Sequence, residues 1–219
     1  MSPPSPEVLS WPADPMGQRD AAEQAARMLR AGGLVVYPTD TVYGLAADPS
    51  QPEAVQRIYE VKGRPDEKAI AWLVASLESV RSSCRVDDRA ERLAERFWPG
   101  ALTLILRRLN PSAEGLSTLG VRMPAHAATL AIIGAFGGPV ATTSANRSGE
   151  PSAQTAAEAL AAIGSGVDLI IDAGAAPGGT ESTVVDLSEE QPRVLRAGAI
   201  PADQVDLALR SSDNDGTRK

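Results

Sequence analysis

The chain of 219 residues is 43% hydrophobic, 22% charged and only 4% aromatic, a composition typical of one globular domain with an aliphatic core. Its net charge of −7 disfavours sequence-independent binding of nucleic acid, and its single cysteine excludes an intrachain disulfide. It has no run of about 18 apolar residues and no leader-like N-terminal pattern, so we expect a cytoplasmic protein without a membrane segment.

The first half of the chain alternates between helix-like and strand-like segments. Residues 1–17 are rich in Pro and Ser and are expected to form a flexible arm, attached to the sheet through Val8, Leu9 and Trp11. The spacing of apolar residues predicts helices over 19–31 and 87–97 and strands over 34–36, 69–74 and 102–106. A loop, PTDTVYGL, follows the first strand. A capping box of Ser50 and Glu53 opens a further helix that ends at KGRPDEK.

The second half continues the alternation, with strands that are less regularly separated by helices. Strands are predicted over 120–123, 140–143, 169–172, 183–187 and 193–195, and helices over 127–133 and 202–209. A second capping box, Thr155 with Glu158, opens an Ala-rich helix that reaches Ile163. These elements predict an α/β (α+β) fold with one mixed sheet, in a domain over 18–210 that is followed by a frayed tail over 211–219.

Polar side chains gather where three of these elements end. The first cluster is Thr39 to Thr41, the second is Lys62, Arg64 and Lys68, and the third lies in PVATTSANRSGEP at 139–151. Loops at the ends of strands are where a rigid α/β scaffold presents a ligand site. From these residues alone, capped turns and a solvated basic loop remain alternatives.

Two separate arginines stand at the ends of predicted strands, Arg122 in GVRMP and Arg196 in LRAG. Arginine suits bidentate binding of a carboxylate or a phosphate, although a surface ion pair would explain either residue.

Several familiar catalytic patterns are missing. The chain has no GxxxxGK[ST] loop, no convincing GxGxxG after a strand and no HExxH. His126 is the only histidine, which excludes a histidine-rich metal site, and we expect it to be exposed to solvent. Cys84 has no histidine nearby in the sequence and Ser144 lies in no GxSxG elbow, which argues against either residue as a nucleophile.

Several motifs lie in order along the chain: YPTDTVYGLAADP at 37–49, KGRP at 62–65, WPGALT at 98–103, VRMP at 121–124, TSANRSGEPS at 143–152, ESTVVD at 181–186 and LRAG at 195–198. Together they closely resemble the YrdC/TsaC family of L-threonylcarbamoyladenylate synthases. The resemblance covers nearly all of residues 19–209. Unrelated motifs in the right order are far more specific than any one of them alone.

The resemblance implies an enzyme that converts ATP, L-threonine and bicarbonate into threonylcarbamoyl-AMP and pyrophosphate, the first step of N6-threonylcarbamoyladenosine (t6A) modification of tRNA. It also implies a twisted mixed sheet flanked by helices with a deep basic groove, Mg2+ bound mainly through the ATP phosphates, and a downstream tRNA threonylcarbamoyl-transferase complex as the recipient. The attacking carbamate and the triphosphate are both anions, so the protein has to neutralise and align them rather than supply a nucleophile. The chain should be the short form of the family, with a YrdC-like domain alone.

By position in the motifs, the resemblance assigns roles to individual residues. The expected ATP ligands are Arg64, Lys68, Thr118, Ser144, Asn146, Ser152 and Arg196. The expected threonine pocket consists of Thr41, Arg122, Thr142 and Ser182, with Arg122 as a clamp for the amino-acid carboxylate. Lys62 and Arg64 are the expected catalytic pair, with Lys62 holding bicarbonate or phosphate. No residue is assigned as a metal ligand.

This chain departs from the family pattern in three places, one of which is WPGALT at 98–103 in place of the more frequent WPGPLT. Lys68, Ala69 and Ile70 stand where the family usually has KPL, so the loop loses a proline constraint. Leu73 stands where some members place a histidine in the threonine pocket, and that contact is not assigned here.

Two alternative functions are weighed against the synthase. The first is a YrdC-like paralogue that acts as an RNA- or nucleotide-binding module without synthase activity, which the acidity of the chain disfavours. The second is a carbamoyl-transfer domain like that of hydrogenase-maturation proteins, whose zinc-finger and acylphosphatase-like neighbours are absent from this sequence.

Overall fold

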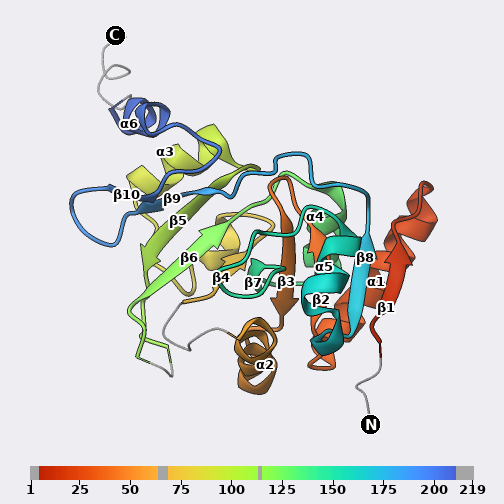
Figure 1. Cartoon of the computed structure of the whole chain (residues 1–219). Helices are drawn as coiled ribbons and strands as arrows, with labels where there is room; N and C mark the ends of the chain where they lie inside the picture. The colour runs from red at the N-terminus through yellow and green to blue at the C-terminus, as the bar shows by residue number, and fades with distance from the viewer. Residues whose placement is uncertain (1–4, 64–68, 113–114, 211–219) are drawn as a thin grey trace.

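The computed structural model of the protein describes residues 5–63, 69–112 and 115–210. In this part of the chain, ten strands form one sheet in the order β1-β8-β2-β3-β7-β4-β6-β5-β9-β10, flanked by six α-helices (Figure 1). The strands are β1 (Glu7–Ser10), β2 (Val35–Pro38), β3 (Tyr43–Ala47), β4 (Ala71–Leu73), β5 (Leu102–Arg107), β6 (Thr118–Arg122), β7 (Val140–Ser144), β8 (Leu169–Asp172), β9 (Thr183–Asp186) and β10 (Arg193–Arg196). The helices are α1 (Pro15–Arg30), α2 (Pro52–Lys62), α3 (Asp88–Phe97), α4 (Ala127–Phe136), α5 (Ala156–Ile163) and α6 (Ala202–Arg210), with short 3-10 turns η1 (Glu78–Val80) and η2 (Gly164–Gly166).

The sheet mixes parallel and antiparallel strand pairs, which confirms the mixed sheet that the sequence predicts. For example, β2 pairs with β3 in antiparallel and with β8 in parallel orientation. The expected N-terminal arm contains β1 and the start of α1, and β1 pairs with β8 so that Leu9 lies opposite Ile171. The first and last strands therefore form the two edges of the sheet.

One half of the sheet is covered by helices on both faces. Val35 and Tyr37 of β2 pack in a core with α1 and α4, whereas Val36 between them packs in a second core with α2 and α5. The residues of β8 divide between the two cores in the same way. This division follows from strand geometry, because successive side chains point to opposite faces.

The other half, made of β4, β6, β5 and β9, has a core on one face and a pocket on the other. Leu102, Leu104 and Leu106 of β5 pack in a third core with residues of α3 and α6. Thr103 and Ile105, which alternate with these leucines, line the pocket. The sequence LTLIL thus separates a core side from a ligand side.

The prediction of a loop over PTDTVYGL is wrong in its second part. Residues 43–47 form β3, which pairs with β2 on one side and β7 on the other. All five residues of β3 are buried. Burial in the middle of the sheet outweighs the local turn signals of Gly44 and the preceding Thr and Asp residues.

The two predicted capping boxes have different outcomes. The box at Ser50 is wrong: the N-cap of α2 is Gln51, which makes no side-chain cap, and Ser50 Oγ donates to Asp48 Oδ1 at 2.7 Å. At α5, Thr155 is the N-cap as predicted, and its Oγ1 accepts from the backbone N–H of Glu158 at 3.2 Å. A nearby carboxylate therefore decides whether a serine caps a helix or a turn.

Candidate active site

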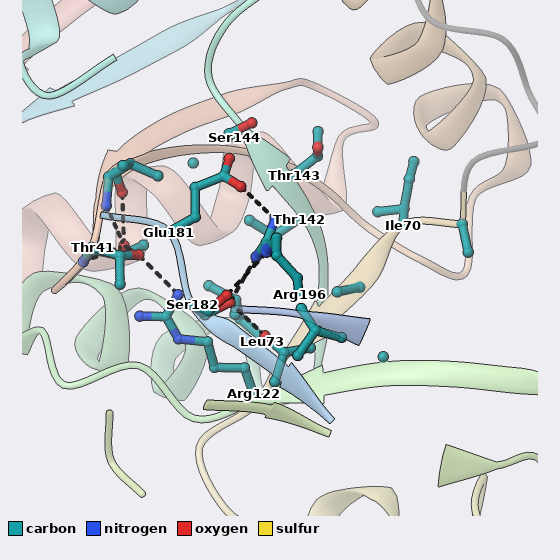
Figure 2. Close-up of a pocket in the computed structure, with 18 of the residues that line it drawn as sticks. Thr41, Ile70, Leu73, Arg122, Thr142, Thr143, Ser144, Glu181, Ser182 and Arg196 are labelled. Carbon is teal, nitrogen blue, oxygen red and sulfur yellow. Dashed lines mark hydrogen bonds and ion pairs between the residues drawn. The ribbon is translucent and has the colours of Figure 1, made fainter. Parts of the chain in front are cut away.

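A pocket of about 480 Å³ opens on the face of the sheet that carries Thr103 and Ile105. Its walls come from β3, β4, β5, β6, β7, β9 and β10, from the end of α2 and from the segment after β7 (Figure 2). Many of its described side chains carry hydroxyl groups, and the charged ones are Lys62, Glu150, Glu181, Arg122 and Arg196. The described wall is thus polar, with a small excess of positive charge.

Strand alternation also sets the floor of the pocket in β6. Thr118, Gly120 and Arg122 line the pocket, while the residues between them belong to the core. A Cβ atom at Gly120 would lie 3.3 Å from the Cβ of Ala71, so a larger side chain would crowd the floor between neighbouring strands. The glycine therefore keeps the floor of the pocket open.

Arg122 is buried at the end of β6, with 8% of its side chain exposed. Its Nε donates to the carbonyl of Gly100 at 2.9 Å, Nη1 to Thr41 Oγ1 at 2.9 Å and Nη2 to Asp40 Oδ1 at 2.6 Å. Burial lowers the pKa of Arg122 and Asp40 opposes that shift, but a guanidinium stays charged in proteins. Three of its five N–H groups are engaged in these bonds, which leaves one on each terminal nitrogen for a ligand.

The turn between β2 and β3 holds the partners of Arg122 in place. Thr39 Oγ1 accepts from the backbone N–H groups of Thr41 at 3.1 Å and Val42 at 3.2 Å. The segment between β8 and β9 packs directly against this turn, where a Cβ at Gly178 would lie 2.5 Å from the carbonyl oxygen of Asp40. Only glycine allows that approach, so the turn is fixed from both sides.

Arg196, at the end of β10, is held by the segment before β9. Its Nε donates to the carbonyl of Ser182 and its Nη2 to Ser182 Oγ, both at 3.0 Å, and its Nη1 donates to Glu181 Oε2. Ser182 Oγ also lies 2.8 Å from Thr103 Oγ1. The chain after Arg196 can approach this segment because a Cβ at Gly198 would lie 2.4 Å from the carbonyl oxygen of Glu181.

Lys62, the last residue of α2, is only 3% exposed. Its Nζ donates to the carbonyls of Ser144 at 2.5 Å and Asn146 at 2.7 Å, and to Asn146 Oδ1 at 3.3 Å. The side-chain nitrogen of Asn146, Nδ2, in turn donates to the backbone carbonyls of Arg147 and Glu150. Lys62 therefore brings its charge to the pocket and orders the segment that follows β7.

Thr142 lies on β7 beside the fully buried Tyr37. The Tyr37 hydroxyl and Thr142 Oγ1 are 2.7 Å apart. Burial raises the pKa of Tyr37 well above its usual range, so the hydroxyl keeps its proton. This contact fixes the rotamer of Thr142 at the pocket wall.

Most of the residues that the sequence singles out meet at this pocket. Those that line it are Thr41, Lys62, Thr118, Arg122, Thr142, Ser144, Asn146, Ser182 and Arg196. Ser152 is not among the lining residues, but its Oγ donates to Glu181 Oε1 at 2.9 Å. Arg64 and Lys68 lie outside the described residues.

Glu181 and Thr103 are not among the site residues expected from the sequence, although both line the pocket. The signal for Thr103 is its place between two leucines in a strand, where alternation points it away from the core. The signal for Glu181 is its place next to Ser182. Apolar side chains complete the wall, among them Ile105 and also Ile70 and Leu73, which Figure 2 labels.

His126 corrects the expectation of a solvent-exposed histidine. It is half-buried at the N-cap of α4, and its Nδ1 is buried without a hydrogen-bond partner among the described residues. Burial lowers its pKa, and the nearby charge of Asp40 opposes the shift. A protonated imidazole is disfavoured here because Nδ1–H would have to be desolvated.

We predict that the free energy of unfolding decreases as the pH falls through the unfolded-state pKa of His126, about 6.5. A base whose pKa is lower in the folded state binds protons preferentially in the unfolded state. Its contribution to the free energy of unfolding is therefore complete above the unfolded-state pKa and is lost as the pH falls below it. Urea unfolding at about pH 7.5 and about pH 5.5 measures this, since Asp and Glu titrate mainly at lower pH. His126→Phe keeps a ring but cannot titrate, and it should flatten the pH dependence; an unchanged slope in this variant would contradict the prediction.

Among the described residues, no group of three or more His, Cys, Asp and Glu side chains is arranged to hold a metal ion. A search of the same residues finds no helix with the length and apolar character needed to cross a membrane.

The chain is similar to proteins of known family over most of its length. The Sua5/yciO/yrdC family model, described as telomere recombination, matches residues 27–198. The threonylcarbamoyl-AMP synthase of Pyrococcus abyssi is 41% identical over 194 residues, which cover 84% of this chain and 56% of that protein. A putative threonylcarbamoyl-AMP synthase of Mycobacterium leprae is 37% identical over 194 residues, which cover 86% of this chain and 87% of that protein.

A solved structure of P. abyssi Sua5 complexed with L-threonine has a TM-score of 0.84 to this fold at 38% identity, covering 92% of this chain and 60% of that one. This chain therefore spans little more than half of the Pyrococcus protein. Because the family model covers residues 27–198 and the folds agree over nearly the whole chain, the chain belongs to the Sua5/YciO/YrdC family and has the YrdC-like fold.

Proposed function

We propose that this protein is a threonylcarbamoyl-AMP synthase, which converts ATP, L-threonine and bicarbonate into threonylcarbamoyl-AMP and pyrophosphate for t6A modification of tRNA. The observation that carries the proposal is a single pocket in which two arginines and a lysine converge with a series of hydroxyl groups. A threonylcarbamoyl-AMP synthase that is 41% identical and a putative one that is 37% identical over most of the chain support it. The product would pass to a tRNA threonylcarbamoyl-transferase complex.

In the proposed reaction, the amine of threonine adds to bicarbonate with loss of water and forms a carbamate. A carbamate oxygen then attacks the α-phosphate of ATP, and pyrophosphate leaves as the new P–O bond forms. Every reacting group is an anion or becomes one, so neutralisation and alignment are the contributions required of the protein. The described pocket offers cations and hydroxyl groups for this task.

Arg122, Thr41, Thr142 and Ser182 are proposed to form the threonine site. The two unengaged N–H groups of Arg122 lie on its two terminal nitrogens, an arrangement suited to a carboxylate. The L-threonine complex of the Pyrococcus relative supports an amino-acid site in this fold.

The proposed nucleotide site consists of Thr118, Ser144, Asn146, Ser152 and Arg196, with Lys62 as a catalytic cation. Arg64 and Lys68 are proposed to join them, with Arg64 beside Lys62 in catalysis. Among the described lining residues, three cations face two carboxylates, so the excess of positive charge is modest. The proposed deep basic groove would gain most of its charge from Arg64 and Lys68.

Mg2+ is proposed to arrive with ATP, bound by phosphate oxygens and water. Mg2+ commonly keeps several waters and uses substrate phosphates rather than an all-protein cage. A pocket with isolated carboxylates and no metal-binding cluster among the described residues fits that mode.

Pyrophosphate release tests the proposed function. With ATP, Mg2+ and bicarbonate present, release is expected to require L-threonine, and threonylcarbamoyl-AMP should be detected by mass spectrometry. Equal release without threonine, or no release from a folded sample, would reject the synthase. A salt-sensitive RNA gel shift in that sample would instead favour the RNA-binding alternative.

A further inference from the structure

Glu181 is the pocket carboxylate that contacts the proposed nucleotide ligands. Its Oε2 accepts from Arg196 Nη1, and its Oε1 accepts from Ser152 Oγ at 2.9 Å. Figure 2 shows the Glu181 side chain reaching toward the Arg196 guanidinium. Both carboxylate oxygens thus occupy donors that suit a phosphate oxygen equally well.

Arg196 does not depend on Glu181 for its orientation. Its Nε and Nη2 are both held at 3.0 Å by Ser182, through the backbone carbonyl and Oγ respectively. These two bonds define the plane of the guanidinium, and only Nη1 is directed to Glu181. Removing the carboxylate charge would therefore leave a positioned arginine with more capacity to bind an anion.

We propose that Glu181 is an internal competitor of the nucleotide phosphates, which sets their affinity by occupying Arg196 and Ser152 and returns to these groups when pyrophosphate leaves. The inference rests on the proposed function, because it takes Arg196 and Ser152 as ligands of a nucleotide phosphate. Glu181 is a specificity-determining residue in this scheme and takes no part in the chemical step.

The pair between Glu181 and Arg196 is suited to such an exchange. The two side chains are 39% and 44% exposed, and ion pairs at this exposure are weak enough to be replaced by a better ligand. A polyphosphate carries more charge and more acceptor oxygens than one carboxylate, so it can displace Glu181. Once pyrophosphate begins to dissociate, the tethered carboxylate can take its place at Arg196.

Binding measurements by calorimetry on the full chain test this proposal with Glu181→Gln, which keeps the shape of the side chain and removes its charge. The variant is expected to bind ATP and pyrophosphate, each with Mg2+, about two- to fivefold more tightly than the parent protein. Adenosine, which carries no phosphate, should bind both proteins equally. Glu189→Gln is the matched control. Glu189 forms an exposed ion pair with Arg107, with 3.1 Å between Oε1 and Nη2, and neither residue lines the pocket.

The possible results separate this inference from the proposed function. If the parent protein binds ATP and Glu181→Gln binds it equally or more weakly, the competitor role is rejected and the synthase stands. If the parent protein binds neither ATP nor pyrophosphate, both are rejected. Tighter phosphate binding in Glu181→Gln, with adenosine binding and the Glu189→Gln control unchanged, establishes the competitor.

Discussion

Replacing Arg122 with lysine is expected to leave the protein folded and to raise the threonine concentration for half-maximal activity roughly 10- to 100-fold. Lysine keeps a positive charge near Asp40 but cannot reproduce the planar fork that donates to Gly100, Thr41 and Asp40. Loss of one charge-assisted hydrogen bond to the substrate, worth about 1.5–3 kcal/mol, accounts for a change of this size. Pyrophosphate release measured against threonine concentration gives the number.

The companion variant Arg122→Ala separates folding from binding. It leaves the carboxylate of Asp40, 13% exposed, without its ion-pair partner, and such a loss typically destabilises a protein by about 3–5 kcal/mol. Urea unfolding should therefore show a large loss for alanine and a small one for lysine. An Arg122→Lys protein with parental threonine dependence would rule out Arg122 as the carboxylate clamp.

Replacing Lys62 with methionine is expected to lower both stability and catalytic rate. The ammonium group donates to the carbonyls of Ser144 and Asn146 and to Asn146 Oδ1, and methionine removes this donor. The Ser144 carbonyl keeps the backbone N–H of Asn146 at 3.0 Å, so the loss falls mainly on the two acceptors of Asn146. A buried acceptor without a partner costs about 1–3 kcal/mol, so the free energy of unfolding should fall by a few kcal/mol. Displacement of Ser144 and Asn146 by about 1 Å, together with the lost charge, should reduce the rate by about 100-fold or more.

A matched control for this variant is Arg19→Met, which removes one positive charge from an exposed position on α1 outside the pocket lining. It should keep both stability and rate. Unfolding curves and pyrophosphate release at saturating substrates measure the two effects separately. A Lys62→Met protein with the parental unfolding midpoint would contradict the role of Lys62 in ordering the segment after β7.

Among the described site residues, Lys62 differs most between the role expected from the sequence and the contacts that it makes in the structure. Its position in KGRP suggests a cation directed only at a substrate anion. In the fold, the side chain reaches backbone carbonyls 82 and 84 positions further along the chain. Such a contact depends on how α2 packs against β3, the neighbour of β7 in the sheet, and no local pattern in KGRP encodes it.

For Arg122 too, the sequence predicts the position of the residue, whereas its contacts depend on the fold. The sequence predicts that it lies at the end of a strand, and Arg122 is the last residue of β6. Its partners Asp40 and Thr41 are 82 and 81 positions away, and they meet Arg122 only because β2, β3, β7, β4 and β6 are neighbours in the sheet. The order of strands in a sheet is set by packing over the whole domain and cannot be inferred from any one segment.

The sequence by itself determined the family resemblance and the types of most elements. Apolar periodicity locates the helices and most strands. Two local predictions from the sequence are wrong. The segment of β3 is predicted as a loop because of its turn residues, and Ser50 donates to Asp48 instead of capping α2. In both cases a burial or hydrogen-bonding partner outweighs the local preference.

Only the tertiary structure decided which polar groups face one another. It half-buries His126, directs Lys62 to the backbone after β7, and sets Glu181 against Arg196 and Ser152. These contacts join segments far apart in the chain, and their strength depends on distance and burial, which are properties of the packed molecule. Residue types fix which interactions are possible, and the arrangement of the strands selects those that form.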